Sequence, residues 1–282
     1  MSWVSKYWDT IDQLYWDPSL LGLASIPKAE WKRGEFGIAV PSERVRNGGS
    51  IYTRKGTAVE NAERMRRLEE PLNHIFDIAF GIAPDEAIQL LFLAPLQISD
   101  PGPFLRLGRE VAARYSGFAN SNTTQQDGFF VGPQSLVGVE LKVGSKTWRG
   151  QALKYLALMV AEEKRSGERE RLGLLYITPA PNEEATFAQT GAGVDGRLPP
   201  DFIEMVPKHE VNRSIREMVT GDRAHFDDAV ARLKVGHTSW HQVAMEAQSL
   251  ADQQDGGTAA GQTYRNLLIG LADAIVSQSG CC

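Results

Sequence analysis

The strongest constraint on the fold is a pair of strand-like segments joined by a short loop. Residues 126–131 and 136–143 are rich in Phe, Val and Leu, and the loop Gly132-Pro133-Gln134-Ser135 separates them. Proline at the second loop position suits a type I turn, around which four-residue hairpin loops are commonly built. We therefore predict an antiparallel hairpin in which Val131 pairs with Leu136.

This register determines which charged side chains meet. Counting back from the loop places Asp127 opposite Glu140, and Lys142 shares the face of Glu140 because strand side chains alternate with a period of two. Opposed carboxylates repel each other, but a divalent cation between them reverses the sign of the interaction. Mg²⁺ typically takes one or two carboxylates together with waters and phosphate oxygens. Two acids, a lysine and a metal ion suffice for phosphodiester hydrolysis, with the lysine beside the attacking water or the phosphate.

The same residues resemble the active-site signature of the PD-(D/E)XK nuclease superfamily. Asp127 is followed, after residues 128–139, by Glu140-Leu141-Lys142, although Gln126 stands where the signature often has proline. A helix predicted from Gly150 to about Arg165 and a buried strand over 172–177 then come in the order of that superfamily. Gln151 and Tyr155, on one face of the helix because they are spaced i, i+4, resemble the Gln-x-x-x-Tyr motif of its exonuclease-like branch.

The resemblance implies an α/β fold with a restriction-endonuclease-like core, in which a small mixed β-sheet is flanked by helices. It implies a nuclease that hydrolyses DNA phosphodiester bonds with Mg²⁺ or Mn²⁺. It assigns metal binding to Asp127, Glu140 and the carbonyl of Leu141. Lys142 would position or activate the water, and Gln151 would support the site. The superfamily often places a glutamate on a helix before the sheet; Glu110 is the natural candidate, with Glu69 and Glu70 as rivals.

The chain divides into three predicted regions. Residues 1–100 form a tryptophan-rich and helical N-terminal region, residues 101–185 the nuclease core, and residues 186–282 a mostly helical C-terminal region. Before the hairpin we predict a helix from Thr57 to about Phe80 with a kink or break at Pro71, a helix over 84–93 with a strand as the alternative, and a helix from the 100–103 turn to about Tyr115. A first core strand is predicted between about 116 and 125. After the core we predict a loop over 180–200 and helices near 209–220, 225–234, 238–252 and 262–277.

Composition limits the surroundings and partners of the chain. The cysteines of the 282-residue chain are Cys281 and Cys282, adjacent at its end, so a cytoplasmic location is expected. No apolar stretch is long enough to span a membrane. The net charge is −5, but residues 28–67 carry an excess of Lys and Arg. The resemblance makes DNA the expected partner, and the basic residues over 28–67 would help to hold its backbone. The N- or C-terminal region is expected to form the interface with any homo-oligomer or protein partner.

Alternative interpretations remain open at this level. A catalytically inactive PD-(D/E)XK-fold module that binds nucleic acid or protein would carry the same signature. An assembly protein would use the tryptophan-rich N-terminus and the C-terminal helices as its interface. His237 and His241 are spaced i, i+4 as in some zinc helices, but no glutamate follows His237 and no cysteine lies nearby.

Overall fold

The fold is a mixed β-sheet covered by helices on both faces. The computed structural model describes residues 3–7, 69–107, 127–142, 147–179 and 183–277. Its sheet has the spatial order β1-β2-β3-β4-β5, with antiparallel pairing from β1 to β3 and parallel pairing from β3 to β5. The strands are β1 (Leu105–Leu107), β2 (Gly128–Val131), β3 (Ser135–Leu141), β4 (Arg171–Thr178) and β5 (Leu233–Ser239). The predicted α/β class with a small mixed sheet is confirmed.

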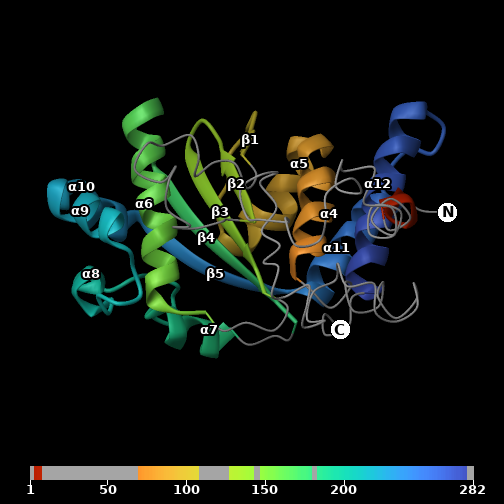
Figure 1. The fold of residues 1–282 in the computed structure, drawn as a ribbon. Helices are drawn as coiled ribbons and strands as arrows, with labels where there is room; N and C mark the ends of the chain where they lie inside the picture. Colours follow the sequence, from red (N-terminus) through yellow and green to blue (C-terminus); the bar gives the residue numbers. More distant parts are fainter. Residues whose placement is uncertain (1–2, 8–68, 108–126, 143–146, 180–182, 278–282) are drawn as a thin grey trace, which may run out of the picture.

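Helices form a layer on each side of this sheet (Figure 1). One layer contains α6 (Arg149–Ser166), α7 (Glu183–Thr190), α8 (Phe202–Met205), α9 (Arg213–Gly221) and α10 (Arg223–Arg232). The other contains α4 (Glu69–Ile82), α5 (Asp85–Ile88), the π-helix η4 (Gln89–Leu93), the 3-10 helix η5 (Ala94–Leu96), α11 (Trp240–Asp252) and α12 (Ala259–Ser277). No helix of the described ranges has both the length and the apolar composition needed to cross a bilayer.

The central strand β3 is buried on both faces, which explains its nearly continuous apolar sequence. Leu136 packs into the core shared with α6, α9 and α10. Val137, Val139 and Leu141 pack into the opposite core, with α4, α11 and α12. Because successive side chains of a strand point to opposite faces, Glu140 is placed in the α6 layer. The fold thus carries an ionisable residue into the middle of a packed three-layer structure.

Several local predictions are confirmed by these elements. The strands around the 132–135 loop, the helix that follows them, the strand over 172–177 and the four C-terminal helices are all present. The segment over 84–93 is helical rather than extended, divided between α5 and η4. Helix α4 begins at Glu69 and has Pro71 in its first turn, and the residues before Glu69 lie outside the described ranges, so the kink or break at Pro71 stays a prediction.

Other local predictions are wrong. Leu105–Leu107 form the edge strand β1 instead of a helix, because they pair with β2 and tertiary pairing overrides local pattern. Residues 183–190 form helix α7 within the predicted loop. Strand β5 separates two predicted helices and adds to the sheet from the region expected to be helical. The strand predicted over 116–125 lies outside the described residues, as do the basic residues over 28–67.

The N-terminal end of the described chain packs against α12. The indole N–H of Trp3 donates a hydrogen bond to the backbone carbonyl of Leu267 at 3.1 Å. Its ring lies over Gly270, where a Cβ atom would collide with the indole. This tryptophan therefore stabilises an internal contact of the chain, while Trp8, Trp16 and Trp31 lie outside the described residues.

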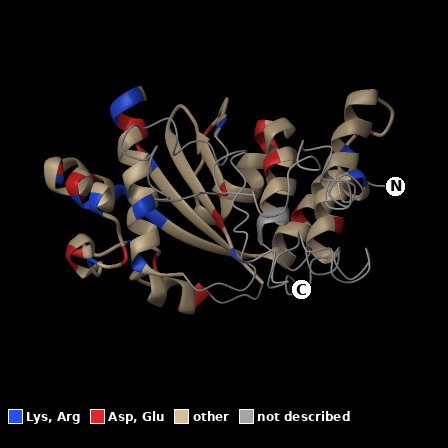
Figure 2. Ribbon diagram, in the orientation of Figure 1, with Lys and Arg blue, Asp and Glu red and all other residues tan. Residues whose placement is uncertain are grey.

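A buried ion-pair network joins α6 to α10. Acidic and basic residues are interspersed along the helices of this layer (Figure 2). The Glu163 carboxylate, 2% exposed, accepts hydrogen bonds from both terminal guanidinium nitrogens of Arg232 at 2.7 and 2.9 Å, and from the Arg169 backbone N–H at 2.8 Å. His225 Nε2 lies 3.0 Å from the same carboxylate. Burial alone would raise the pKa of Glu163, but these hydrogen bonds outweigh it and lower the pKa.

This network predicts a pH-dependent contribution to stability. The lowered pKa means that the stabilisation is present above the ordinary pKa of glutamate and is lost as pH falls through the folded-state pKa. Glu163→Gln should reduce the free energy of unfolding by about 1.5–3 kcal/mol near neutral pH, and by less in acid. Urea titrations at decreasing pH measure this difference. Glu217→Gln, which removes an exposed pair with Arg213, is the control; equal losses in both variants at every pH would contradict the prediction.

Candidate functional site

The register of the β2–β3 hairpin is the one that the loop predicts. Val131 pairs with Leu136, and the ladder extends to the pair Gly128 and Val139. Asp127 lies one residue before β2, so continuation of the register places it opposite Glu140. The turn closes with a hydrogen bond from the Gly132 N–H to the Ser135 carbonyl at 2.8 Å.

Asp127 is held at the end of the hairpin by two donors. Its Oδ2 accepts a hydrogen bond from the Leu141 backbone N–H at 2.8 Å, and its Oδ1 accepts one from the Asn73 side-chain amide at 2.5 Å. Asn73 lies on α4, so this buried carboxylate connects the start of β2, the end of β3 and a helix. The carboxylate of Asp127 is thereby fixed directly beside the backbone of the Glu140-Leu141-Lys142 segment.

Glu140 is the centre of a buried polar cluster. Lys142 Nζ lies 2.6 Å from Glu140 Oε1, which also accepts a hydrogen bond from the Gln151 side-chain amide. Glu140 Oε2 accepts a hydrogen bond from the Tyr155 hydroxyl at 2.5 Å. Glu140 and Lys142 are each 4% exposed, so an ammonium and a carboxylate neutralise each other inside the protein. The structure therefore brings together Glu140, Lys142, Gln151 and Tyr155.

Helix α6 supplies Gln151 and Tyr155 because it packs very closely on β3. A Cβ atom at Gly138 would lie 2.5 Å from Cδ1 of Tyr155, so only glycine leaves room for the tyrosine ring. The Tyr155 hydroxyl also lies 2.8 Å from the Val139 carbonyl. Burial, followed by the negative charges of Glu140 and Asp127, raises the pKa of Tyr155 well above its ordinary value. The hydroxyl thus stays protonated as a donor to Glu140.

Unpartnered polar atoms surround the two carboxylates. Among the described residues, the side-chain oxygens of Asn73 and Gln151 and the hydroxyl of Tyr176 are buried without a hydrogen-bond partner. Tyr176 pairs with Glu140 across the β3–β4 ladder. An unsatisfied buried polar group costs about 1–3 kcal/mol, and such groups call for a bound water, an ion or a ligand. The amide nitrogens already donate to carboxylates, so the free oxygens are oriented to accept hydrogen bonds from such a ligand.

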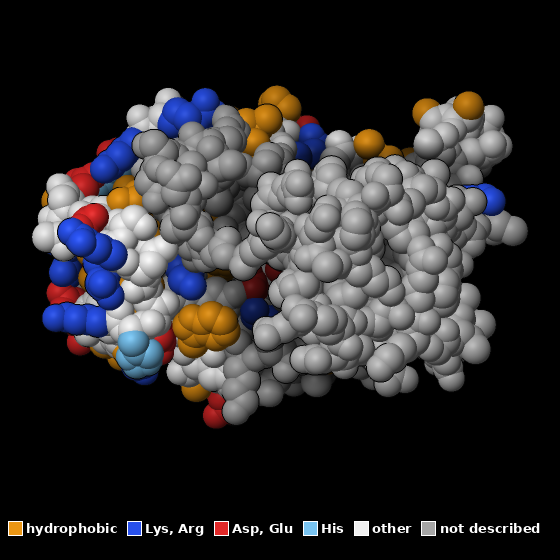
Figure 3. All heavy atoms as spheres, in the orientation of Figure 1, with side chains coloured by type: hydrophobic (Ala, Val, Ile, Leu, Met, Phe, Trp, Pro, Cys, Tyr) orange, Lys and Arg blue, Asp and Glu red, His pale blue; other side chains and the backbone are white. Residues whose placement is uncertain are grey.

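The rim of the cluster combines an exposed aromatic ring with two cations. Trp148 is 38% exposed, and the Nζ atoms of Lys142 and Lys154 lie 5.6 and 5.9 Å from its ring centroid. Burial lowers the pKa of Lys154, against the opposing effect of the Glu140 and Glu210 charges. Figure 3 shows acidic and basic side chains inside a hollow near the middle of the face that is drawn, with a hydrophobic side chain at its edge. This composition suits a polyanion with flat groups.

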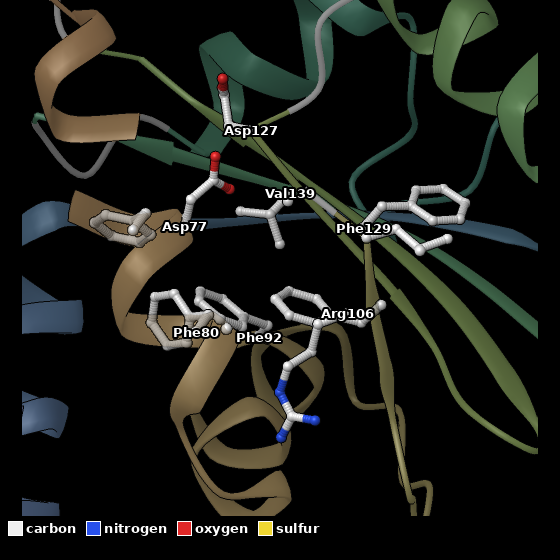
Figure 4. A pocket seen from close by; sticks show the side chains of 12 residues that line it. Asp77, Phe80, Phe92, Arg106, Asp127, Phe129 and Val139 are labelled. Carbon is white, nitrogen blue, oxygen red and sulfur yellow. The ribbon is translucent and has the colours of Figure 1, made fainter. Parts of the chain in front are cut away.

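Some predicted site residues are placed differently or are outside the described ranges. Glu110 lies outside the described residues. The helix beside Asp127 is α4, which contributes Asn73 and, in Figure 4, Asp77 near Asp127. The side chain of Leu141 is fully buried in the apolar core, and the backbone N–H of Leu141 donates a hydrogen bond to Asp127.

The sequence alone did not identify Asn73, Lys154 or Tyr176 as site residues. A signal existed for Asn73, which is a polar residue on the same apolar helix face as Leu72 and Phe76. A buried amide of this kind calls for a partner. No comparable signal marked Lys154 or Tyr176.

The histidine pair does not form a zinc helix. His237 lies on β5 and His241 on α11, so the i, i+4 spacing does not place them on one helical face. The imidazole of His237 instead lies 2.8 Å from the Thr178 hydroxyl. Within the described ranges, no three His, Cys, Asp or Glu side chains are grouped closely enough to hold a metal ion by themselves.

Comparisons of the chain with protein-family models, with curated proteins and with solved structures find no match.

The close packing of Tyr155 on β3 predicts a selective effect of a small substitution. Gly138→Ala should displace the Tyr155 ring and lower the free energy of unfolding by about 1–3 kcal/mol, the usual cost of overpacking. Gly128→Ala is the matched control on the adjacent strand, because its nearest contact, at 3.4 Å, is an ordinary one. Denaturant unfolding of both variants measures the effect. Similar stabilities for the two variants would show that Tyr155 is not confined in this way.

Proposed function

We propose that the protein is a metal-dependent nuclease that hydrolyses DNA phosphodiester bonds. One observation carries the proposal: a buried glutamate is contacted at once by a lysine, a glutamine and a tyrosine, with an aspartate fixed beside it. A chain selected only for stability rarely buries so many polar groups, because apolar residues in place of a buried ion pair are often neutral or stabilising.

The order of elements supports a restriction-endonuclease-like core. Three antiparallel strands are followed by helix α6 and by β4, which is parallel to β3. Asp127 directly precedes the second strand, Glu140 lies in the third, and Lys142 directly follows it. Gln151 and Tyr155 then come from the first turns of the following helix. The resemblance implies the same succession of a helix and a strand after the Glu140–Lys142 segment, and this agreement supports the proposal.

The donors of the cluster suit a hard divalent cation. Asp127 and Glu140 offer carboxylate oxygens and Leu141 a backbone carbonyl, and Mg²⁺ or Mn²⁺ completes its coordination with waters and phosphate oxygens. The unpartnered oxygens of Asn73 and Gln151 suit hydrogen bonds from such waters. A bound cation supplies charge compensation for the phosphate and lowers the pKa of a bound water. In the described structure Lys142 already contacts Glu140, so the cation and the Lys142 ammonium would compete for that carboxylate.

The other groups of the protein have separate roles in the proposed reaction. The Leu141 N–H and Asn73 fix the orientation of Asp127, and the Tyr155 hydroxyl fixes that of Glu140. The Lys142 ammonium, released from Glu140, is a buried cation available to orient the attacking water or to stabilise negative charge developing on the phosphate. Gln151 donates to Glu140 through its nitrogen, which leaves its oxygen for a water. Charged groups placed this way act strongly because they are shielded from solvent.

One observation favours a catalytically inactive binding module as the second candidate. Each carboxylate oxygen of Asp127 and Glu140 accepts a hydrogen bond or an ion pair from a protein group. A scaffold that keeps this fold without catalysis needs no cation, because Lys142 neutralises Glu140. Metal binding at the cluster therefore separates the two functions.

The proposed chemistry predicts which substitutions abolish cleavage. Linear and circular DNA are incubated with the protein in Mg²⁺, Mn²⁺ or EDTA, and the products are resolved on gels. Glu140→Gln and Lys142→Gln should each lower the cleavage rate by about 10²–10³-fold, as removal of one charge-stabilising group commonly does. EDTA should stop cleavage by the wild type.

Lys164→Gln provides the control for these variants. It removes a lysine whose Nζ pairs with Asp222 at 2.6 Å, on the surface and away from the cluster. This variant should cleave at the wild-type rate. A Glu140→Gln variant that is folded and as active as the wild type would show that the nuclease proposal is wrong.

A further inference from the structure

A second feature, an aromatic pocket, adjoins the cluster at Asp127. The pocket has a volume of about 220 Å³. Its described lining includes Phe76, Phe80, Phe92, Phe130, Arg106 and Asp127. The phenylalanines come from α4, η4 and β2, and Figure 4 shows Phe80 and Phe92 between the carboxylate of Asp77 and the guanidinium of Arg106. Of the cluster residues described above, Asp127 lines this space, whereas Glu140, Lys142, Gln151 and Tyr155 do not.

The pocket is large enough for an aromatic ring, and aromatic side chains line it. A dry cavity of about 150 Å³ lined by apolar side chains accommodates benzene, and this pocket is larger, at about 220 Å³. The rings of Phe92 and Phe130 are nearly parallel, with 14° between their planes and 5.1 Å between their centroids. Phe80 meets Phe92 edge-on, with 4.5 Å between the centroids. Such walls favour a planar aromatic ligand over an aliphatic one.

Polar groups at the pocket favour a heteroaromatic ring. Arg106 is held by the Ala83 carbonyl and by Asp85 Oδ1 at 2.5 and 2.7 Å, which leaves its buried Nε–H without a partner among the described residues. Arg106, Asp77 and Asp127 all belong to the lining of the pocket, so the lining contains a hydrogen-bond donor and two carboxylates. A ligand with an acceptor on one edge and an N–H donor on another complements this lining, and nucleobases have both.

Asp127 connects the pocket to the cluster. The same residue lines the aromatic pocket and accepts the hydrogen bond from Leu141, next to Glu140. The pocket lies on the α4 face of the sheet and ends at Asp127, so a base held in it would place its own backbone beside the Asp127 carboxylate. We propose, on the basis of the nuclease function above, that the pocket takes one unpaired nucleobase of single-stranded DNA whose backbone lies at the Asp127–Glu140–Lys142 cluster. A base within a duplex is stacked and paired, so it must leave the helix before it enters such a pocket.

The chain offers a matched pair of variants to test the pocket. Gly81 lines the pocket from α4, is exposed, and a Cβ atom added there meets no atom within 4 Å. Gly81→Leu therefore narrows the pocket without removing a wall. Gly221, near the end of α9, is also exposed and equally open, but it does not line the pocket. Gly221→Leu is the control for the loss of a helical glycine.

Binding is measured without catalysis, by fluorescence anisotropy of a short single-stranded DNA in EDTA. A series of strands of the same sequence, each with one abasic nucleotide at a different position, is tested in the same way. One abasic position should weaken binding to the wild type by about tenfold, as loss of base stacking does. Gly81→Leu should bind the intact strand about tenfold more weakly than the wild type and be insensitive to the abasic position. Gly221→Leu should match the wild type.

Two results would overturn the pocket proposal. One is the absence of single-strand binding by the wild type, and the other is equal binding of intact and abasic strands. The abasic scan uses the wild type, so it decides the question even where Gly81→Leu does not fold. Abasic-sensitive binding without DNA cleavage in Mg²⁺ or Mn²⁺ would refute the nuclease and retain the pocket. A cleavage rate that changes neither with abasic positions nor with Gly81→Leu would refute the pocket proposal and retain the nuclease proposal.

Discussion

The buried ion pair of Glu140 and Lys142 is the interaction on which the rest of the site depends. Each ion loses its hydration on burial, at a cost of several kcal/mol, so the carboxylate must be surrounded by donors. The ammonium of Lys142, the amide of Gln151 and the hydroxyl of Tyr155 provide them. This requirement brings α6 close to β3, and Gly138 makes the close approach possible. The local sequence from Gly138 to Lys142 and the first turns of α6 are therefore parts of one arrangement.

Stability alone does not account for this arrangement. Tyr176 and the side-chain oxygens of Asn73 and Gln151 are buried near the carboxylates without a hydrogen-bond partner in the described residues. A protein under selection for stability alone would remove such groups or satisfy them. In the proposed function, a hydrated cation and a phosphate would complete the hydrogen bonding of these groups. The exposed ring of Trp148 and the Lys154 ammonium lie at the rim, where they would contact the proposed polyanionic substrate.

The sequence predicted those parts of the site that depend on short-range pattern. The 132–135 loop and the alternation of β3 set the register, and the spacing of Gln151 and Tyr155 placed both on the inner face of α6. The edge strands were missed for physical reasons. Leu105–Leu107 form a strand that pairs with β2 across an intervening segment, and β5 mixes Lys234 and His237 with apolar residues between two helices. Neither has a local pattern that distinguishes it from its neighbours.

Contacts between segments that are distant in the sequence could also not be predicted from local sequence patterns. Asn73 reaches Asp127 from a helix 54 residues earlier in the chain, and Arg106 lines the aromatic pocket only because β1 pairs with β2. Period and spacing indicate which face of an element is buried, but not which other element covers it. The carboxylate–lysine core of the site was thus predictable, whereas its supporting amide, its rim and the adjacent pocket required the tertiary structure.

Binding of a divalent cation by the cluster, as proposed, is measured by anomalous diffraction from crystals grown with Mn²⁺. We expect an anomalous peak within coordination distance of both Asp127 and Glu140, with Lys142 Nζ withdrawn from its contact with Glu140 Oε1, which is 2.6 Å in the described structure. Absence of a peak at these carboxylates at saturating Mn²⁺, with the Lys142–Glu140 contact intact, would contradict it.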